Sequence, residues 1–185
     1  TAKLNFRSVD EAFREAVEQG VFPGAAVLAA KAGRIVLEDA YGFRSSLADS
    51  QRMHTGDVFD VASLTKPLAT TTALMVLVRG GKVALDDPIS KFVPAAVSPQ
   101  TRKITLRQLL AHTSGLPAWR PYYQEVTAME RAGIKAFVGS HEAKKYVFER
   151  VLKEPLVWAH GTHGDYSALG FILLGEIVEL VGGCA

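Results

Sequence analysis

The chain lacks three features that would each define a class of protein: paired cysteines, long hydrophobic runs and an excess of charge of one sign. Its single cysteine, Cys184, lies next to the chain end and cannot form an intrachain disulfide, which excludes a disulfide-stabilised scaffold. The longest apolar runs, such as AAVLAA and ALMVLV, are far shorter than the roughly 20 residues that span a bilayer. The sequence therefore predicts a soluble protein without a membrane span.

The charge balance gives no sign of a nucleic-acid partner. The 21 Lys and Arg residues are almost matched by 19 Asp and Glu residues, and the basic residues are scattered instead of forming a stripe. A chain of 185 residues can bury most of its apolar surface in one globular unit. Residues 1–20 lack the profile of a signal peptide, which leaves both the cytoplasm and export after signal removal open.

The first part of the chain predicts a helix followed by a β-hairpin. Ser8 is the expected N-cap of the helix, with Glu11 as its capping-box partner and Gly20 as the end. Residues 24–40 contain two short stretches rich in Val, Leu and Ile around the turn sequence KAGR, which is typical of a hairpin. Residues 61–80 then predict a largely apolar helix that ends at two glycines.

The remainder predicts a mainly helical region from about residue 80 to residue 165, closed by one more helix. A short helix begins at Thr105, with Gln108 as capping-box partner, and ends by Gly115. Helical patterning continues through 141–152. Residues 169–181 are apolar on nearly every face, so most of that helix should be buried. Together these elements predict an α+β fold, in which helices pack on an antiparallel sheet.

Ser63 and Lys66 form the first candidate for chemistry. A serine with a lysine three positions later is expected about once by chance in a chain of this length. On a helix, however, these positions share a face. A serine hydroxyl is a poor nucleophile until a base takes its proton, and a lysine can be that base only when neutral, a form that burial favours. The alternative is that Ser63 caps the helix while Lys66 extends into solvent.

Three segments that occur in a characteristic order and spacing favour the catalytic interpretation of Ser63 and Lys66. They are ASLTK at 62–66, LLAHTSGLP at 109–117 and DYSALGFILLGEIVE at 165–179. Their order and spacing resemble the class C β-lactamase and penicillin-recognising serine hydrolase superfamily, which includes carboxylesterases and D-peptidases. The resemblance runs from about Gly24 to Gly183. It implies a β-lactamase/transpeptidase-like fold, of which residues 1–185 would be the N-terminal and helical portion of a single domain.

The resemblance also implies a role for each matching residue. Ser63 would be the acylated nucleophile, Lys66 its proton partner, and Tyr166 the group that moves a proton between Ser63, the leaving group and water. No cofactor and no metal is implied. The substrate would be a small molecule with an ester, β-lactam or D-amino peptide bond. An alternative for Tyr166 is that it is a buried core tyrosine.

The chain departs from the family pattern after Tyr166. β-Lactamases and peptidases usually carry Tyr-x-Asn, whose amide contacts the substrate, whereas this chain has Tyr166-Ser167-Ala168. Alanine offers no hydrogen bond, so Ala168 as a substrate-binding position favours esterase-like chemistry. The residues leave the choice between ester, β-lactam and D-peptide open.

The segment GLPAWRPYYQE at 115–125 is expected at the mouth of the cleft. Its aromatic residues Trp119, Tyr122 and Tyr123 could line an acyl pocket. They could equally cover the core from a long loop, because aromatic side chains occur both in hydrophobic cores and at binding surfaces.

Two further interpretations compete with a serine hydrolase. His160, His163 and Asp165 invite a metal-dependent hydrolase, although their spacing fits no common ligand pattern. The second competing interpretation is a catalytically silent or binding-only relative. The family's third motif, a strand with Lys-Thr-Gly or His-x-Gly, does not occur after the second motif. KAG at 31–33 does not replace it, because this segment is a hairpin turn. Losing one oxyanion donor typically costs a factor of about 10²–10³ in rate. The chain is therefore expected to self-associate or to need a complementing C-terminal segment.

Overall fold

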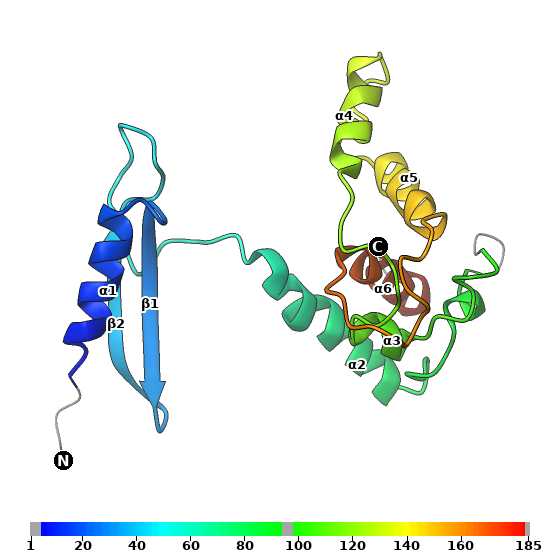
Figure 1. Ribbon diagram of the computed structural model, residues 1–185, viewed down its shortest axis with the longest axis horizontal. Helices are drawn as coiled ribbons and strands as arrows, with labels where there is room; N and C mark the ends of the chain where they lie inside the picture. The colour runs from blue at the N-terminus through cyan, green and yellow to red at the C-terminus, as the bar shows by residue number, and fades with distance from the viewer. Residues whose placement is uncertain (1–4, 94–97, 184–185) are drawn as a thin grey trace. The chain divides into compact units, whose positions relative to one another are not determined.

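The computed structural model describes residues 5–93 and 98–183, so Cys184 lies outside the described residues. The chain divides into two compact units, the first ending at Asp60 and the second beginning at Val61. In the first unit, helix α1 (Arg7–Glu18) packs against a hairpin of β1 (Gly24–Lys31) and β2 (Arg34–Gly42) (Figure 1). The second unit is helical. Helices and a small antiparallel sheet agree with the predicted α+β class.

The hairpin follows the sequence prediction closely. Its antiparallel register runs from Gly24 opposite Gly42 to Lys31 opposite Arg34, with a two-residue turn between the strands. The turn residues Ala32 and Gly33 both have positive φ, 51° and 74°. This is the backbone of the primed turns, whose twist matches that of the two strands.

Helix α1 begins differently from the prediction. Ser8 is not the N-cap, because the helix starts at Arg7 and Phe6 occupies the cap position without a side-chain hydrogen bond. Asn5 Oδ1 instead accepts the Arg7 N–H, at 3.0 Å. An amide oxygen one residue further out thus satisfies one of the free N–H groups of the first turn. The predicted end is correct, since Gly20 has a φ of 68° directly after the helix.

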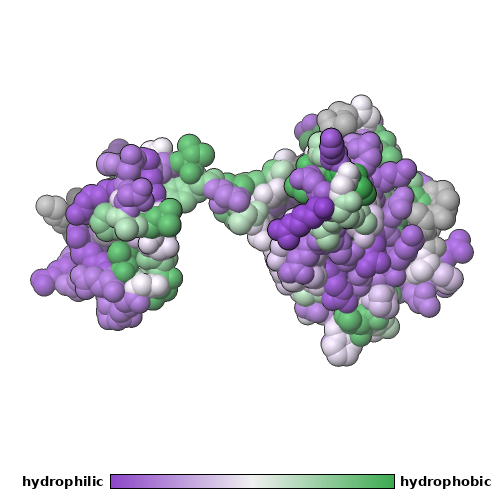
Figure 2. Space-filling model, turned by 90° about the horizontal axis from the view of Figure 1, so that it is seen from above, coloured by the Kyte–Doolittle hydropathy of each residue, from purple (hydrophilic) through white to green (hydrophobic). Residues whose placement is uncertain are grey.

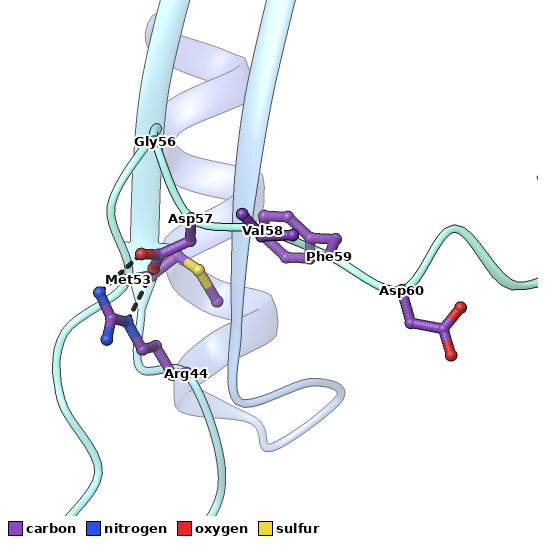
Figure 3. A pocket seen from close by; sticks show the side chains of 7 residues that line it. All are labelled: Arg44, Met53, Gly56, Asp57, Val58, Phe59 and Asp60. Carbon is purple, nitrogen blue, oxygen red and sulfur yellow. Dashed lines mark hydrogen bonds and ion pairs between the residues drawn. The ribbon is translucent and has the colours of Figure 1, made fainter.

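The loop after β2 is closed by an ion pair. The Arg44 guanidinium donates to both carboxylate oxygens of Asp57, at 3.0 and 2.6 Å, and also to Gln51, at 2.7 Å. Figure 3 shows this pair at the wall of a hollow of about 430 Å³. Hydrogen bonds from Arg44 and then from the His54 N–H hold the pKa of Asp57 below its ordinary value. The residues lining this hollow include none of the candidate site residues.

The segment predicted as one helix over residues 61–80 has three parts. It starts with a 3₁₀ turn, η1 (Ala62–Leu64), continues as a π-helix, η2 (Lys66–Thr71), and becomes α-helical only in α2 (Thr72–Arg79). Pro67 lies in the first turn of η2, where a residue without an N–H is tolerated. The predicted end at Gly80 and Gly81 is correct.

Helix α6 (Ala168–Gly182) is the centre of the second unit. It packs against α2, against α3 (Leu106–Leu110) and against α5 (His141–Leu152). The core is completed by residues near η3 (Ile89–Lys91), and its largest fully buried side chains are Leu74, Ile89, Ile104, Leu106, Leu109, Leu116, Val151, Leu152, Leu169, Leu173, Leu174 and Ile177. The predicted burial of 169–181 therefore holds for one broad side of the helix, while Leu180 remains exposed.

Two further helices lie in the predicted, mainly helical region from about residue 80 to residue 165. Thr105 and Gln108 form the predicted capping box at the start of α3, which ends at Leu110, before Gly115. Helix α4 (Tyr122–Arg131) follows it. It is joined to α5 by Glu125, which pairs with Arg150 at 3.1 Å.

The surface carries exposed hydrophobic side chains on the first unit and on the segment that follows it (Figure 2). Val58 and Phe59, at the end of the first unit, and Val61, at the start of the second, are exposed. Within the described residues, no helix combines the length and the hydropathy needed to cross a bilayer.

The space around two glycines predicts stability changes of opposite sign. A Cβ on Gly115 would overlap the Trp158 carbonyl, and Gly115 has a φ of 77°. Gly115→Ala should therefore lower the free energy of unfolding by about 2–4 kcal/mol. Gly175 lies within α6 and has open space at its Cβ position, so Gly175→Ala should raise the free energy of unfolding by about 0.5–1 kcal/mol. Urea denaturation of both variants measures this, and a destabilised Gly175→Ala would contradict the packing of α6.

Candidate active site

Ser63 and Lys66 lie side by side although the segment is not a regular α-helix. Ser63 is in the 3₁₀ turn η1, and Lys66 is the first residue of η2. Lys66 Nζ donates a hydrogen bond to Ser63 Oγ at 3.3 Å. The Ser63 side chain is exposed and Lys66 is half-buried. A nucleophile open to solvent with an amine at hydrogen-bond distance is the arrangement that nucleophilic catalysis requires.

Tyr166 completes a cluster with these two residues. It precedes α6, and its ring centroid lies 5.0 Å from Lys66 Nζ. Hydrogen bonds to Ser63 and then to Lys66 hold the pKa of Tyr166 below its ordinary value, against the opposing effect of burial. Tyr166 is 53% exposed, so it is not the buried core tyrosine of the alternative interpretation. Lys66 Nζ also lies 5.7 Å from the ring centroid of Phe171.

The residue before Ser63 has an unusual backbone conformation. Ala62 has a φ of 43°, in the left-handed region that costs a residue with a Cβ roughly 1–2 kcal/mol. Such residues often occur next to functional groups, where the surrounding structure enforces an otherwise unfavourable geometry. The conformation of Ala62 sets the direction in which the chain presents Ser63.

The start of α6 is fixed to the segment 117–118, which places Tyr166. Ser167 is the N-cap of α6 and is 1% exposed. Its hydroxyl donates to the Pro117 carbonyl at 2.7 Å and accepts the Gly170 N–H at 3.3 Å. The Ala168 N–H donates to the Ala118 carbonyl at 2.8 Å. Ala168 is half-buried and offers only a methyl group.

His112 is a site residue that the sequence reasoning did not single out, although it lies within LLAHTSGLP. Its ring centroid is 4.5 Å from that of Tyr166, and its Nδ1 accepts the Ser167 N–H at 3.0 Å. Burial, followed by the positive charge of Lys66, holds the pKa of His112 below its ordinary value. In the sequence, only the position of His112 within LLAHTSGLP pointed to it. Its ring contact with Tyr166 joins positions 54 residues apart, which a local pattern does not indicate.

Two of the three aromatic residues expected at an acyl pocket are accessible. Trp119 and Tyr123 are exposed, with ring centroids 6.3 Å apart. Tyr122 is buried, and its hydroxyl donates to Glu154 at 2.8 Å. Burial and that hydrogen bond raise the pKa of Tyr122. Tyr122 is part of the hydrophobic core, as the alternative interpretation expects, although it lies in α4 and not on a loop.

These aromatic residues border a groove between α4, α5 and the side of α6. The groove has a volume of about 750 Å³. Its lining is largely apolar, with charged groups among it, and comprises Trp119, Arg120, Tyr122, Tyr123, Val126, Gly139, Ser140, His141, Ala143, Lys144, Val147, Ile172 and Glu179. Lys144 pairs with Glu179 and, at 3.5 Å, with Glu176, so its charge is compensated.

The two histidines of the metal hypothesis make separate contacts. His160 Nδ1 lies 3.3 Å from Gln108 Nε2. The His163 ring stacks on Trp158 with centroids 4.2 Å apart. Among residues 5–93 and 98–183, no group of three or more His, Cys, Asp or Glu side chains is arranged to hold a metal ion.

Comparison with known proteins identifies one family and several relatives. Residues 9–184 match the family model described as Beta-lactamase. The chain is 35% identical over 195 residues to N-acetylmuramyl-L-alanine amidase of Bacillus subtilis (strain 168), an alignment that covers 99% of this chain and 42% of the relative.

Solved structures share the fold. A class C beta-lactamase in complex with cefoxitin is 25% identical with a TM-score of 0.73, covering 97% of this chain and 45% of that one. EstCE1, a hydrolase with promiscuous acyltransferase activity, is 28% identical with a TM-score of 0.73, covering 96% of this chain and 47% of that one. The chain thus spans less than half of the length of each of these relatives.

The hydrogen bonds around Tyr166 predict a measurable titration. Ser63→Ala removes the largest of the effects that lower the pKa of Tyr166, so this pKa should rise towards its ordinary value of about 10. NMR of ¹³Cζ-labelled tyrosine between pH 7 and 11 measures it. Ser46→Ala, at an exposed serine of the first unit, is the matched control and should leave the titration unchanged. An unchanged pKa of Tyr166 in Ser63→Ala would contradict the hydrogen bond.

Proposed function

The chain belongs to the β-lactamase family, and on this premise we propose that the protein is a serine hydrolase that forms a covalent acyl-enzyme on Ser63. The observation that carries the proposal is the hydrogen bond between Lys66 Nζ and Ser63 Oγ, at 3.3 Å, with Tyr166 bonded to both. Nucleophile, base and proton shuttle are the three roles that hydrolysis through an acyl-enzyme needs.

The arrangement supports a two-step reaction. Ser63 Oγ attacks the carbonyl carbon of the substrate and gives its proton to the Lys66–Tyr166 pair, while the bond to the leaving group breaks and the leaving group takes up a proton through Tyr166. Water then attacks the acyl ester, returns a proton by the same route, and frees the acid and Ser63. A lowered pKa of Tyr166 makes its phenolate form more accessible near neutral pH, which suits proton transfer in both directions.

Ala168 supports an ester in preference to a β-lactam or peptide. The side chain at this position is a half-buried methyl group, which cannot donate to the amide of a β-lactam or peptide substrate. A site without that hydrogen bond should not select substrates by an amide in their acyl group. It therefore suits reactive esters, whose cleavage depends less on amide recognition.

The groove of α4, α5 and α6 supports an apolar acyl group. Trp119 follows Ala118, whose carbonyl accepts the Ala168 N–H, so the aromatic end of the groove begins next to the start of α6. Ile172 lies one turn of α6 beyond Ala168 and lines the same groove. Its apolar lining and the compensated charge of Lys144 favour an uncharged aryl or medium-length acyl chain.

A catalytically silent, binding-only relative is the alternative function. It differs from the hydrolase in a single measurable property, whether Ser63 can be acylated. The chain spans less than half of its relatives, so labelling should be measured on the longest form of the protein that carries this chain.

Covalent labelling tests the proposal directly. A fluorophosphonate and a p-nitrophenyl ester should each add one adduct to Ser63, seen by intact mass and peptide mapping. Lys66→Ala and Tyr166→Phe should each slow acylation by at least about 10³-fold, and the double variant should lose little more, because the two residues act as a unit. Lys82→Ala, at an exposed lysine at the end of α2, is the control.

Two outcomes would count against the proposal. Additive losses in the double variant would separate Lys66 from Tyr166. A folded sample without an adduct on Ser63 from any acylating reagent, a fluorescent penicillin included, would make the binding-only function the better one.

The acyl groove predicts a substrate preference that depends on Trp119. The protein should hydrolyse p-nitrophenyl hexanoate and phenylacetate with a lower KM than the acetate, because the longer acyl groups bury apolar surface in the groove. Trp119→Ala should raise KM for the hexanoate about tenfold and leave the acetate nearly unchanged. Trp158→Ala, an exposed tryptophan outside the groove, is the control. Equal effects of Trp119→Ala on both esters would place the acyl group elsewhere.

A further inference from the structure

We propose that His112 is a positioning residue that holds Tyr166 beside Lys66 by binding the N–H groups of Asp165 and Ser167, and that protonation of its ring releases the bond to Ser167. The inference rests on the proposed function for its kinetic consequence. The positioning itself can be measured without any activity.

His112 accepts hydrogen bonds from the residues directly before and after Tyr166. The His112 carbonyl accepts the Asp165 N–H at 2.9 Å, and His112 Nδ1 accepts the Ser167 N–H at 3.0 Å. The N–H groups of the residues directly before and after Tyr166 are thus both bound by one residue of a distant segment. With its neighbours fixed, the backbone of Tyr166 has little freedom to turn, and its hydroxyl stays within reach of Ser63 and Lys66.

The imidazole ring also restricts the phenol ring. The His112 ring centroid lies 4.5 Å from that of Tyr166 and 5.2 Å from that of Phe171, with the planes tilted by 32° in each pair. Lys66 Nζ lies near the other two rings, 5.0 Å from the centroid of Tyr166 and 5.7 Å from that of Phe171. His112 thus packs on the same two aromatic rings as the catalytic amine.

The hydrogen bond to Ser167 depends on the protonation state of His112. Nδ1 can accept the peptide N–H only when it carries no proton, so the proton of the neutral ring is on Nε2. The imidazolium form has N–H groups at both nitrogens and would place a donor against a donor. Protonation therefore breaks the bond to Ser167 and loosens one of the two attachments of Tyr166.

Three charged or titratable residues lie around His112, and of these Lys66 opposes its protonation. Lys66 from η2 is the charged group that acts on it, Tyr166 is the titratable group in ring contact, and Asp165 binds it through the backbone N–H. Burial and the Lys66 charge hold the pKa of His112 below the ordinary value of about 6.5. The neutral ring is accordingly the form present near pH 7, and the hold weakens only on acidification.

Asparagine is the matched substitution for a test. His112 has a φ of 55°, a left-handed conformation that asparagine tolerates better than other non-glycine residues. The Asn oxygen is bonded to Cγ, as Nδ1 is in histidine, so His112→Asn keeps an acceptor for Ser167 but does not titrate. His112→Ala removes the acceptor, and His54→Asn, at an exposed histidine of the first unit, is the control.

The first measurement needs no turnover. In His112→Ala, the pKa of Tyr166, followed by ¹³Cζ NMR, should rise towards about 10 because the phenol moves away from Ser63 and Lys66. In His112→Asn and in the His54→Asn control it should stay at the value of the unsubstituted protein. An unchanged pKa of Tyr166 in His112→Ala, with the fold intact by circular dichroism, would overturn the positioning role even if Ser63 were never acylated.

The second measurement is the pH dependence of Ser63 acylation by a fluorophosphonate. At pH 8, His112→Ala should lower the maximal inactivation rate about 10–100-fold without changing the half-saturating concentration, and His112→Asn should restore most of that rate. The ratio of the His112→Asn rate to the unsubstituted rate cancels the titration of Lys66 and Tyr166. This ratio should rise as pH falls through the pKa of His112, by up to about tenfold for each unit below it.

These rates separate the inference from a merely structural role. A ratio that stays constant between pH 8 and pH 4.5 would overturn the proton-dependent release, and equal rates for His112→Ala and His112→Asn would overturn the role of the acceptor. Failure of the reagent to label Ser63 in the unsubstituted protein would count against the proposed function, while the Tyr166 titration still decides the positioning role.

Discussion

The candidate active site depends on one buried hydroxyl, that of Ser167. This group donates to the Pro117 carbonyl and accepts the Gly170 N–H, while the Ser167 N–H donates to His112. It therefore caps α6 and joins the helix to the segment 112–117. A buried hydroxyl without hydrogen-bond partners would cost several kcal/mol. The hydrogen bonds of Ser167 are therefore kept once the core has positioned α6. Because Tyr166 directly precedes Ser167, the position of Ser167 also determines where Tyr166 lies.

The hydrophobic core determines where that hydroxyl lies. Leu169, Leu173 and Ile177 follow helical spacing on α6 and are buried against α2 and α3, so the helix can adopt only one rotation about its axis. That rotation brings the N-terminal end of α6 to Ser63 and Lys66, which come from a segment about 100 residues earlier. Apolar packing thus supplies the geometry, while the polar groups at the helix start supply the chemistry.

Elements with strong local signals could be predicted from the sequence, and elements set by distant contacts could not. The KAGR turn, the Thr105 capping box and the apolar helix after Tyr166 are local patterns, and the structure has all three. The cap at Ser8 failed because Asn5, a competing cap just upstream, binds the first helical N–H instead. The π-helix at Lys66, the helical start at Tyr122 and the ring of His112 beside Tyr166 depend on tertiary packing, which periodicity does not report.

The site also contains two residues whose backbone is unfavourable by itself. Ala62 and His112 both have positive φ without being glycine, 43° and 55°, at a combined cost of roughly 2–4 kcal/mol. One directly precedes Ser63 and the other binds the N–H groups of the residues directly before and after Tyr166. Strain of this size persists only where well-packed neighbours enforce it, and both residues adjoin segments that pack on α6. The stability of the core is therefore what keeps Ser63 and Tyr166 in their relative positions, so a loss of packing around α6 would disturb the candidate site.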